Sequence, residues 1–188
     1  MVSKDDLLFR QVFTLKDGAR VLLRPLTKDD RQALLEFFLP VTPDERRIFR
    51  HDVSDANLVE SWIDNLDYDK VFPLVAVVGN RIVGNTTLHF HDGPARHRAE
   101  VRIFLAKDFR QRGLGVRMLQ GLIEIARRRS LYLLEVFIVS DSTQLIRAFH
   151  NAGFEVKCVF EDYFMLPDGG LKDISQMILR LRAVEEEF

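Results

Sequence analysis

The stretch "DFRQRGLGVRML", residues 108–119, places Gly113 and Gly115 one residue apart among three arginines. The segment "VRIFLA" (101–106) directly before it has the composition of a strand, and the apolar residues after it recur at helical spacing. The chain therefore passes from a strand to a helix through a corner where two residues lack side chains. A helix N-terminus offers unpaired N–H groups and partial positive charge, and glycine lets a ligand approach the main chain. The corner predicts a site for an anion such as phosphate.

Two common phosphate-binding motifs do not fit this corner. The dinucleotide fingerprint G-x-G-x-x-G needs a third glycine where the chain has Met118, and the P-loop string G-x-x-x-x-G-K-[ST] does not occur in the sequence. What remains is R-x-x-G-x-G, from Arg110 to Gly115.

Charge and composition narrow the class of protein. Ten Lys or Arg and three acids lie between Ala95 and Arg129, whereas eight acids and four bases lie between Pro40 and Lys70. The net charge of -1 argues against a general nucleic-acid binder. The one cysteine excludes an internal disulfide framework and a cysteine-based zinc site. With no apolar stretch of signal-peptide or membrane-span length, we expect a cytoplasmic protein with no membrane contact and no metal.

The order of expected elements defines the fold class. Strands are expected at 19–26, 71–78, 81–90, 98–105, 131–139 and in a final hairpin, with helices after Thr27, Thr42 and Ser54, at the glycine corner, and before Gly153. A strand-helix-strand crossover is normally parallel, whereas hairpins are antiparallel. We therefore expect one α/β (α+β) domain over 1–188, core about 20–182, with a mixed sheet of six or seven strands flanked by helices.

The motif R-x-x-G-x-G resembles the signature [QR]-x-x-G-x-[GA] of the GNAT N-acetyltransferase superfamily, which stands at a strand-to-helix corner. The neighbouring strand "RIFL", helix "VRMLQGLIEIA", strand "LYLLEVFIV" and helix end "NAGF" extend the resemblance over roughly Arg24 to Leu181. A narrower resemblance, in "LRPLTKDDRQALLEFFLPVTPDERRIF" and "HRAEVRIFL", is to the bacterial protein-lysine acetyltransferase branch.

The resemblance implies acetyl-CoA as co-substrate, held between two parallel strands that splay apart in the middle of the sheet. It implies that main-chain groups of Ile103, Phe104 and Leu105 pair with the pantetheine arm. It places the diphosphate on the amides of the corner residues Gln111, Arg112, Gly113, Leu114, Gly115 and Val116, with added charge from Arg112. Ser142 stands where relatives have a cofactor-contacting asparagine. The alternative is a glycine turn that serves only tight helix packing.

An amine acceptor must lose a proton before it attacks, because a lysine-like amine has a pKa of about 10.4. The resemblance implies Glu100 of "AEV" as the general base. Its alternative role is a salt bridge to Arg98 or Arg102. Glu135 is the second candidate, because other branches use a glutamate on that strand and an acid in an apolar run is costly to bury without a role. His89 and His91 share a strand face. A zinc site there lacks nearby partner ligands, so we expect a substrate-channel or surface role for them.

One departure concerns the leaving group. Many relatives have a tyrosine before the last helical glycine to protonate the thiolate, and Phe149 stands there instead. Tyr163 and Tyr132 are the substitutes to consider.

The sequence leaves three functions open: acetyl transfer to a primary amine on a protein lysine, transfer to a small-molecule amine, or acyl-CoA sensing without turnover. It also leaves open a homodimer.

Overall fold

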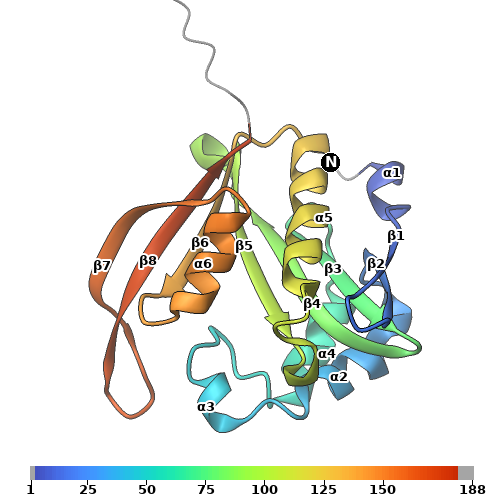
Figure 1. Ribbon diagram of the computed structural model, residues 1–188, viewed down its shortest axis with the longest axis horizontal. Coiled ribbons are helices and arrows are strands. Elements are labelled where there is room, and N and C mark those ends of the chain that lie inside the picture. The colour runs from blue at the N-terminus through green and yellow to red at the C-terminus, as the bar shows by residue number, and fades with distance from the viewer. Residues whose placement is uncertain (1–2, 182–188) are drawn as a thin grey trace, which may run out of the picture.

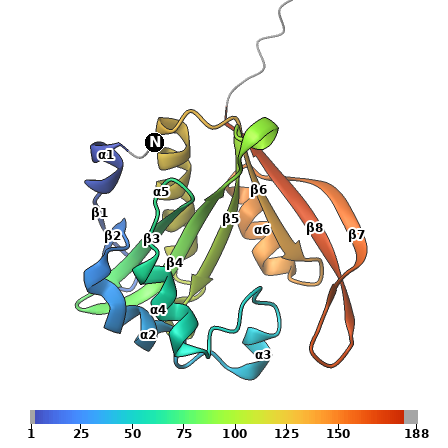
Figure 2. The same cartoon turned by 180° about the vertical axis from the view of Figure 1, so that it is seen from behind.

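The computed structural model describes residues 3–181 and shows one mixed sheet with helices on both faces (Figures 1 and 2). The strands are β1 (Gln11–Thr14), β2 (Arg20–Pro25), β3 (Val71–Val78), β4 (Arg81–Phe90), β5 (Arg98–Leu105), β6 (Leu133–Val139), β7 (Glu155–Met165) and β8 (Leu171–Arg180). The helices are α1 (Lys4–Leu7), α2 (Arg31–Phe38), α3 (Pro43–Arg46), α4 (Ala56–Asp64), α5 (Leu114–Arg128) and α6 (Thr143–Asn151). The single α/β domain predicted from the sequence is thus observed, while the ends at 1–2 and 182–188 lie outside the described residues.

The sheet has eight strands in the order β1-β2-β3-β4-β5-β6-β8-β7. The prediction of six or seven strands missed β1. This strand pairs antiparallel with β2 from Gln11↔Leu23 to Thr14↔Arg20. This strand has four residues at the edge of the sheet, and Val12 is 56% exposed. Its sequence "QVFT" is too short for a period of two to be recognised.

The two middle strands are parallel and separate soon after they meet. β5 and β6 pair at three positions, Arg98↔Leu133, Ala99↔Leu134 and Glu100↔Glu135. Beyond Glu100, β5 continues to pair with β4 as far as Leu105, and β6 continues to pair with β8 as far as Val139. Figure 1 shows the two strands diverging toward the end of the sheet where α3 lies. The predicted splayed pair is therefore present.

Helix α5 packs its apolar stripe on the sheet, next to α6 on the same face, while α2 and α4 cover the other face (Figures 1 and 2). The predicted stripe of Leu114, Met118, Leu122 and Ile125 is completely buried, and burial of each such side chain contributes about 1.5–3 kcal/mol. Gly121 allows the close approach, because a Cβ there would lie 2.6 Å from Leu23 Cδ2 on β2.

None of the helices in residues 3–181 is both long and apolar enough to cross a membrane.

Candidate active site

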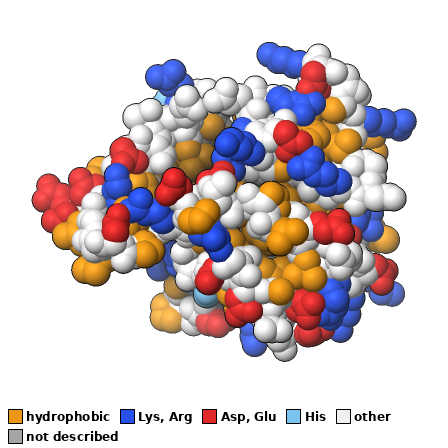
Figure 3. Space-filling view, turned by 90° about the horizontal axis from the view of Figure 1, so that it is seen from below, with side chains coloured by type: hydrophobic (Ala, Val, Ile, Leu, Met, Phe, Trp, Pro, Cys, Tyr) orange, Lys and Arg blue, Asp and Glu red, His pale blue; other side chains and the backbone are white. Residues whose placement is uncertain are grey.

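A cavity of about 1170 Å³ occupies the gap between the diverging strands. It is lined by β5 from Glu100 to Leu105, by β6 from Val136 to Val139, and by parts of the glycine corner and of α6. The segment after α3, Ile48–Arg50, closes another side. Figure 3 views this end of the molecule, where hydrophobic side chains border a hollow among basic and acidic ones.

The glycine corner forms one end of this cavity. Gly113 is the N-cap of α5 with a φ of 86°, a left-handed conformation that favours glycine, and no side chain caps the helix. A Cβ on Gly113 would meet nothing within 4 Å, and one on Gly115 would meet Leu105 Cδ1 at 3.4 Å. Because the first N–H groups of a helix have no partner within it, the corner presents main-chain donors beside open space.

Most of the residues that the resemblance assigned to acetyl-CoA line this cavity, and two of the described ones do not. Those that line it are Ile103, Phe104, Leu105, Gln111, Gly113, Gly115, Val116 and Ser142. Leu114 is fully buried in the core. Arg112 is turned toward other partners, because its guanidinium pairs with Asp17, donates to the Asp108 carbonyl (2.9 Å) and lies over the Phe109 ring. The main-chain amides of Arg112 and Leu114 remain predicted to bind the diphosphate. The side chain of Arg112 is already paired with these other groups.

Two glutamines connect the corner to α6. Gln111 Nε2 donates to Gln144 Oε1 at 3.2 Å, close to Ser142, the N-cap of α6. Gln111 has a φ of 59°, which is uncommon for a residue with a side chain. The two sides of the splayed pair are thus held together at this point by one side-chain contact.

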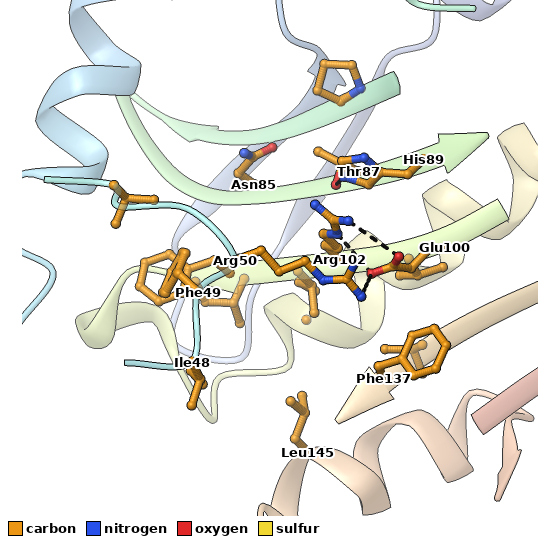
Figure 4. A pocket seen from close by; sticks show the side chains of 18 of the residues that line it. Ile48, Phe49, Arg50, Asn85, Thr87, His89, Glu100, Arg102, Phe137 and Leu145 are labelled. Carbon is orange, nitrogen blue, oxygen red and sulfur yellow. Dashed lines mark hydrogen bonds and ion pairs between the residues drawn. The ribbon is translucent and has the colours of Figure 1, made fainter. Parts of the chain in front are cut away.

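Glu100 lies in the cavity between two arginines (Figure 4). Glu100 is 7% exposed, and its carboxylate accepts from Arg102 Nε at 2.9 Å. Arg50, from the segment after α3, reaches the same oxygen, Oε1, at 2.8 Å. The predicted salt bridge to Arg102 is therefore present, while Arg98 pairs elsewhere. The sequence did not indicate Arg50, whose segment has no periodic pattern.

Polar side chains of β4 face Glu100 and its surroundings. From the sequence, His89 was expected to have a substrate-channel or surface role, whereas Thr87 and Asn85 were not indicated. His89 is the register partner of Glu100, and its Nε2 lies 2.9 Å from Thr87 Oγ1. Burial, together with the charge of Arg102, lowers the pKa of His89 to about 4, so the ring is neutral at pH 7. Asn85 lines the same cavity, and its buried Oδ1 has no hydrogen-bond partner in the described structure.

Glu135 is held outside the cavity lining by a different set of partners. His91 Nε2 lies 2.9 Å from Oε1, and Arg98 Nη1 and Gln176 Nε2 donate to Oε2 at 3.3 and 3.0 Å. Glu135 is 3% exposed, and its contacts connect β6 with β5, with β8 and with the residue after β4. Its position fits a structural ion network better than a proton acceptor. His91 is part of that network, and no group of three His, Cys, Asp or Glu in residues 3–181 is arranged for a metal.

The aromatic residues considered for the leaving group lie in different places. Phe149 lines the cavity and is fully buried against Phe154, with ring centroids 5.0 Å apart. Tyr163 contributes to a small neighbouring pocket with Arg47 and Phe49. Tyr132 precedes β6, at the end of the strand where β5 and β6 are still paired. Neither tyrosine hydroxyl is brought to the main cavity.

The acidic segment 40–70 does not form an acidic wall of the cavity. Glu45 and Asp67 are its acids in the lining, and both are paired, Glu45 with Arg110 at 2.6 Å and Asp67 with Lys70 at 3.8 Å. The excess of acids in this segment of the sequence therefore gives no support for a cationic acceptor in the cavity.

The family follows from the comparison with known proteins. The model of the acetyltransferase (GNAT) family matches residues 33–154, which include the splayed strands, the glycine corner and α6. The chain belongs to this family, as the motif at the glycine corner predicted.

One relative found by sequence and two solved structures illustrate what this chain is similar to. An uncharacterized N-acetyltransferase of Methanocaldococcus jannaschii is 26% identical over 148 residues, 77% of this chain; the match spans 65% of the relative's own length. The yncA protein of Salmonella typhimurium was solved with its cofactor acetyl-CoA. It superposes with a TM-score of 0.76 at 21% identity, and the match covers 88% of this chain and 96% of that one. The GNAT domain of PAT from S. lividans gives a TM-score of 0.76 at 18% identity, covering 96% and 99%.

At these identities the two solved structures show the fold alone. The narrower resemblance to the protein-lysine acetyltransferase branch stays a prediction.

Proposed function

We propose that this chain transfers the acetyl group of acetyl-CoA to a primary amine. The observation that carries the proposal is the gap between β5 and β6: their pairing stops at Glu100↔Glu135, and a cavity continues from there to the uncapped N-terminus of α5. The family and the fold of a relative solved with acetyl-CoA support the same function.

The residues around the gap fit a coenzyme A thioester. The corner offers main-chain N–H donors and the positive end of a 15-residue helix, which suit a diphosphate. The space beside Gly113 is open where a Cβ would otherwise project. Toward β6, the main chain of Ile103 to Leu105 has no strand partner, so it is free to pair with the amides of a pantetheine arm.

Glu100 is the proposed proton acceptor, because it is the carboxylate of the lining placed where the strands separate. An ammonium acceptor loses one proton to Glu100, and its nitrogen then bonds to the acetyl carbon as the carbon–sulfur bond breaks. The second proton of the nitrogen ends on the departing thiolate. A thiol with a pKa near 8.5 is a fair leaving group, so Phe149 in place of a donor is compatible with turnover.

A second candidate is an acyl-CoA sensor without turnover. It is favoured by two observations: Phe149 cannot protonate a thiolate, and Glu100 is held by two guanidinium groups. Both candidates predict binding of acetyl-CoA, and only the enzyme predicts release of free thiol.

The test combines calorimetric titration with acetyl-CoA and a thiol-release assay over amines, amino acids and lysine-bearing proteins. Binding together with acceptor-dependent thiol release supports the transferase, and binding without release from any acceptor supports the sensor. If acetyl-CoA neither binds nor raises the melting temperature, both are wrong. The acceptor screen also decides between a protein lysine and a small molecule.

A further inference from the structure

We propose that Arg50 and Arg102 bind a carboxylate of the acceptor, so that the acceptor is a small molecule with a carboxylate next to its primary amine, as in an amino acid. This proposal rests on the proposed function and specifies its substrate. It starts from the charges that line the cavity.

The cavity has an unbalanced positive charge at one place. Its carboxylates are Glu45, Asp67 and Glu100, and its Lys and Arg side chains are Lys70, Arg50, Arg102 and Arg110. Glu45 pairs with Arg110 and Asp67 pairs with Lys70, so these four cancel. Glu100 alone remains opposite both Arg50 and Arg102. The imbalance of one positive charge therefore lies at Glu100.

Shared use of one carboxylate leaves donor capacity on both arginines. Arg50 and Arg102 both contact Glu100 Oε1, at 2.8 and 2.9 Å, and Arg102 Nη2 is 3.4 Å from Oε2. A guanidinium has five N–H donors in a planar fork suited to a carboxylate. Arg50 and Arg102 are 42% and 32% exposed, so they remain accessible from the cavity.

This positive charge is far from the diphosphate end of the cavity. Leu105 lies five positions after Glu100 on the extended strand, which corresponds to about 16 Å, and the glycine corner follows Leu105. His89, the register partner of Glu100 on β4, is neutral at pH 7 and adds no charge. The two arginines are therefore placed to meet the acceptor and not the coenzyme phosphates.

The arrangement couples acceptor binding to release of the base. A carboxylate that takes over Arg50 leaves Glu100 with one cation in place of two, immediately beside the amine that must lose a proton. Figure 4 shows Arg50 entering from the segment after α3, with Arg102 on β5 opposite it and apolar Phe49 and Phe137 around them. The apolar neighbours suit an amino acid with an apolar side chain.

The test compares matched acceptors in the thiol-release assay. Leucine and phenylalanine are each compared with the corresponding amide and with the decarboxylated amine, 3-methylbutylamine or phenethylamine. The proposal expects the amino acids to have the lower KM. In Arg50→Gln and Arg102→Gln we expect the KM of the amino acids to rise about 10- to 100-fold, the range of a charge-assisted hydrogen bond. The KM of the amines should change little. Arg50→Lys should recover part of the effect, and Arg20→Gln, an exposed residue on β2, is the control.

A second measurement does not depend on turnover: titration of the complex with free CoA by N-acetyl-leucine or N-acetyl-phenylalanine, the expected products, should show binding that Arg50→Gln weakens. Equal effects of Arg50→Gln on the KM of amino acids and of amines overturn the proposal. Thiol release with amines but never with amino acids also overturns it, while leaving the transferase intact. Absence of release from any acceptor refutes the transferase, and this proposal with it.

Discussion

Glu100 and Glu135 are register partners at the last position where β5 and β6 pair. Carboxylates directly opposite each other on neighbouring strands repel, and each has its own cations: Arg50 and Arg102 for Glu100, Arg98 for Glu135. The ladder ends at this pair, and the cavity begins there. The two acids therefore have different surroundings although they are adjacent.

This relationship predicts a contrast between two otherwise identical substitutions. Glu100→Gln should lower kcat about 10²- to 10⁴-fold, the contribution of a positioned base, with the affinity for acetyl-CoA almost unchanged. Glu135→Gln should instead lower the free energy of unfolding by about 1–3 kcal/mol, because it removes a buried acceptor of three hydrogen bonds. Thiol release and urea unfolding of both variants separate the effects. Normal turnover in Glu100→Gln would show that Glu100 is not the base.

The two glycines of the corner should also respond differently. Gly113 has a φ of 86°, so Gly113→Ala should cost about 1–2 kcal/mol of stability through backbone strain. Gly115 lies within α5, and a Cβ there makes ordinary contact with Leu105. Gly115→Ala should therefore be neutral or stabilising by up to about 1 kcal/mol, since alanine is the better helix former.

The same two variants should also differ in their affinity for acetyl-CoA. If the amides of the corner hold the diphosphate, Gly113→Ala should weaken binding more than Gly115→Ala does, because it also disturbs the corner's conformation. Calorimetry under conditions where both variants remain folded measures this difference. Equal affinities would indicate that the corner serves helix packing alone.

The sequence predicted the parts of this site that depend on neighbouring residues. β5 was expected at 98–105 and is observed there, because its apolar run is bounded by clear breaks. The glycine corner has its own motif, and the contact in which Arg102 donates to Glu100 follows from their spacing of two on one strand face. Arg50 could not be predicted in this way. Its contact with Glu100 depends on where the segment after α3 lies on the folded sheet.

The entry to α2 offers a stability test in a region remote from the glycine corner. Arg24 Nη1 and Nη2 each donate to Asp30 at 2.6 Å, and Thr27 N donates to the same carboxylate at 2.8 Å. Burial alone would raise the pKa of Asp30, but the bonds from Arg24 and Thr27 outweigh it and lower the pKa. Asp30→Asn should cost about 2–4 kcal/mol at pH 7, because it leaves Arg24 without its anion.

Exposed Asp29 provides the matched control, since Asp29→Asn should change stability by less than about 0.5 kcal/mol. The lowered pKa also sets the direction with pH. The stabilisation from Asp30 is complete above the ordinary pKa of 3.8 and is lost as the pH falls below it. The difference between wild type and Asp30→Asn in urea unfolding should accordingly shrink toward pH 3. A difference that stays constant with pH would contradict the ion pair.

His89 predicts a second pH dependence, in a different window. Its pKa is about 4 in the folded protein against 6.5 ordinarily, with burial as the main cause. Between these two values the unfolded chain binds a proton that folded His89 does not, so stability falls as the pH drops from about 6.5 toward 4. Each pH unit in this window costs up to about 1.4 kcal/mol. His89→Gln should remove this slope, and exposed His150→Gln should retain it. Urea midpoints at pH 7.5, 6 and 5 measure the slopes, and a His89→Gln curve parallel to that of the wild type would mean that His89 titrates normally.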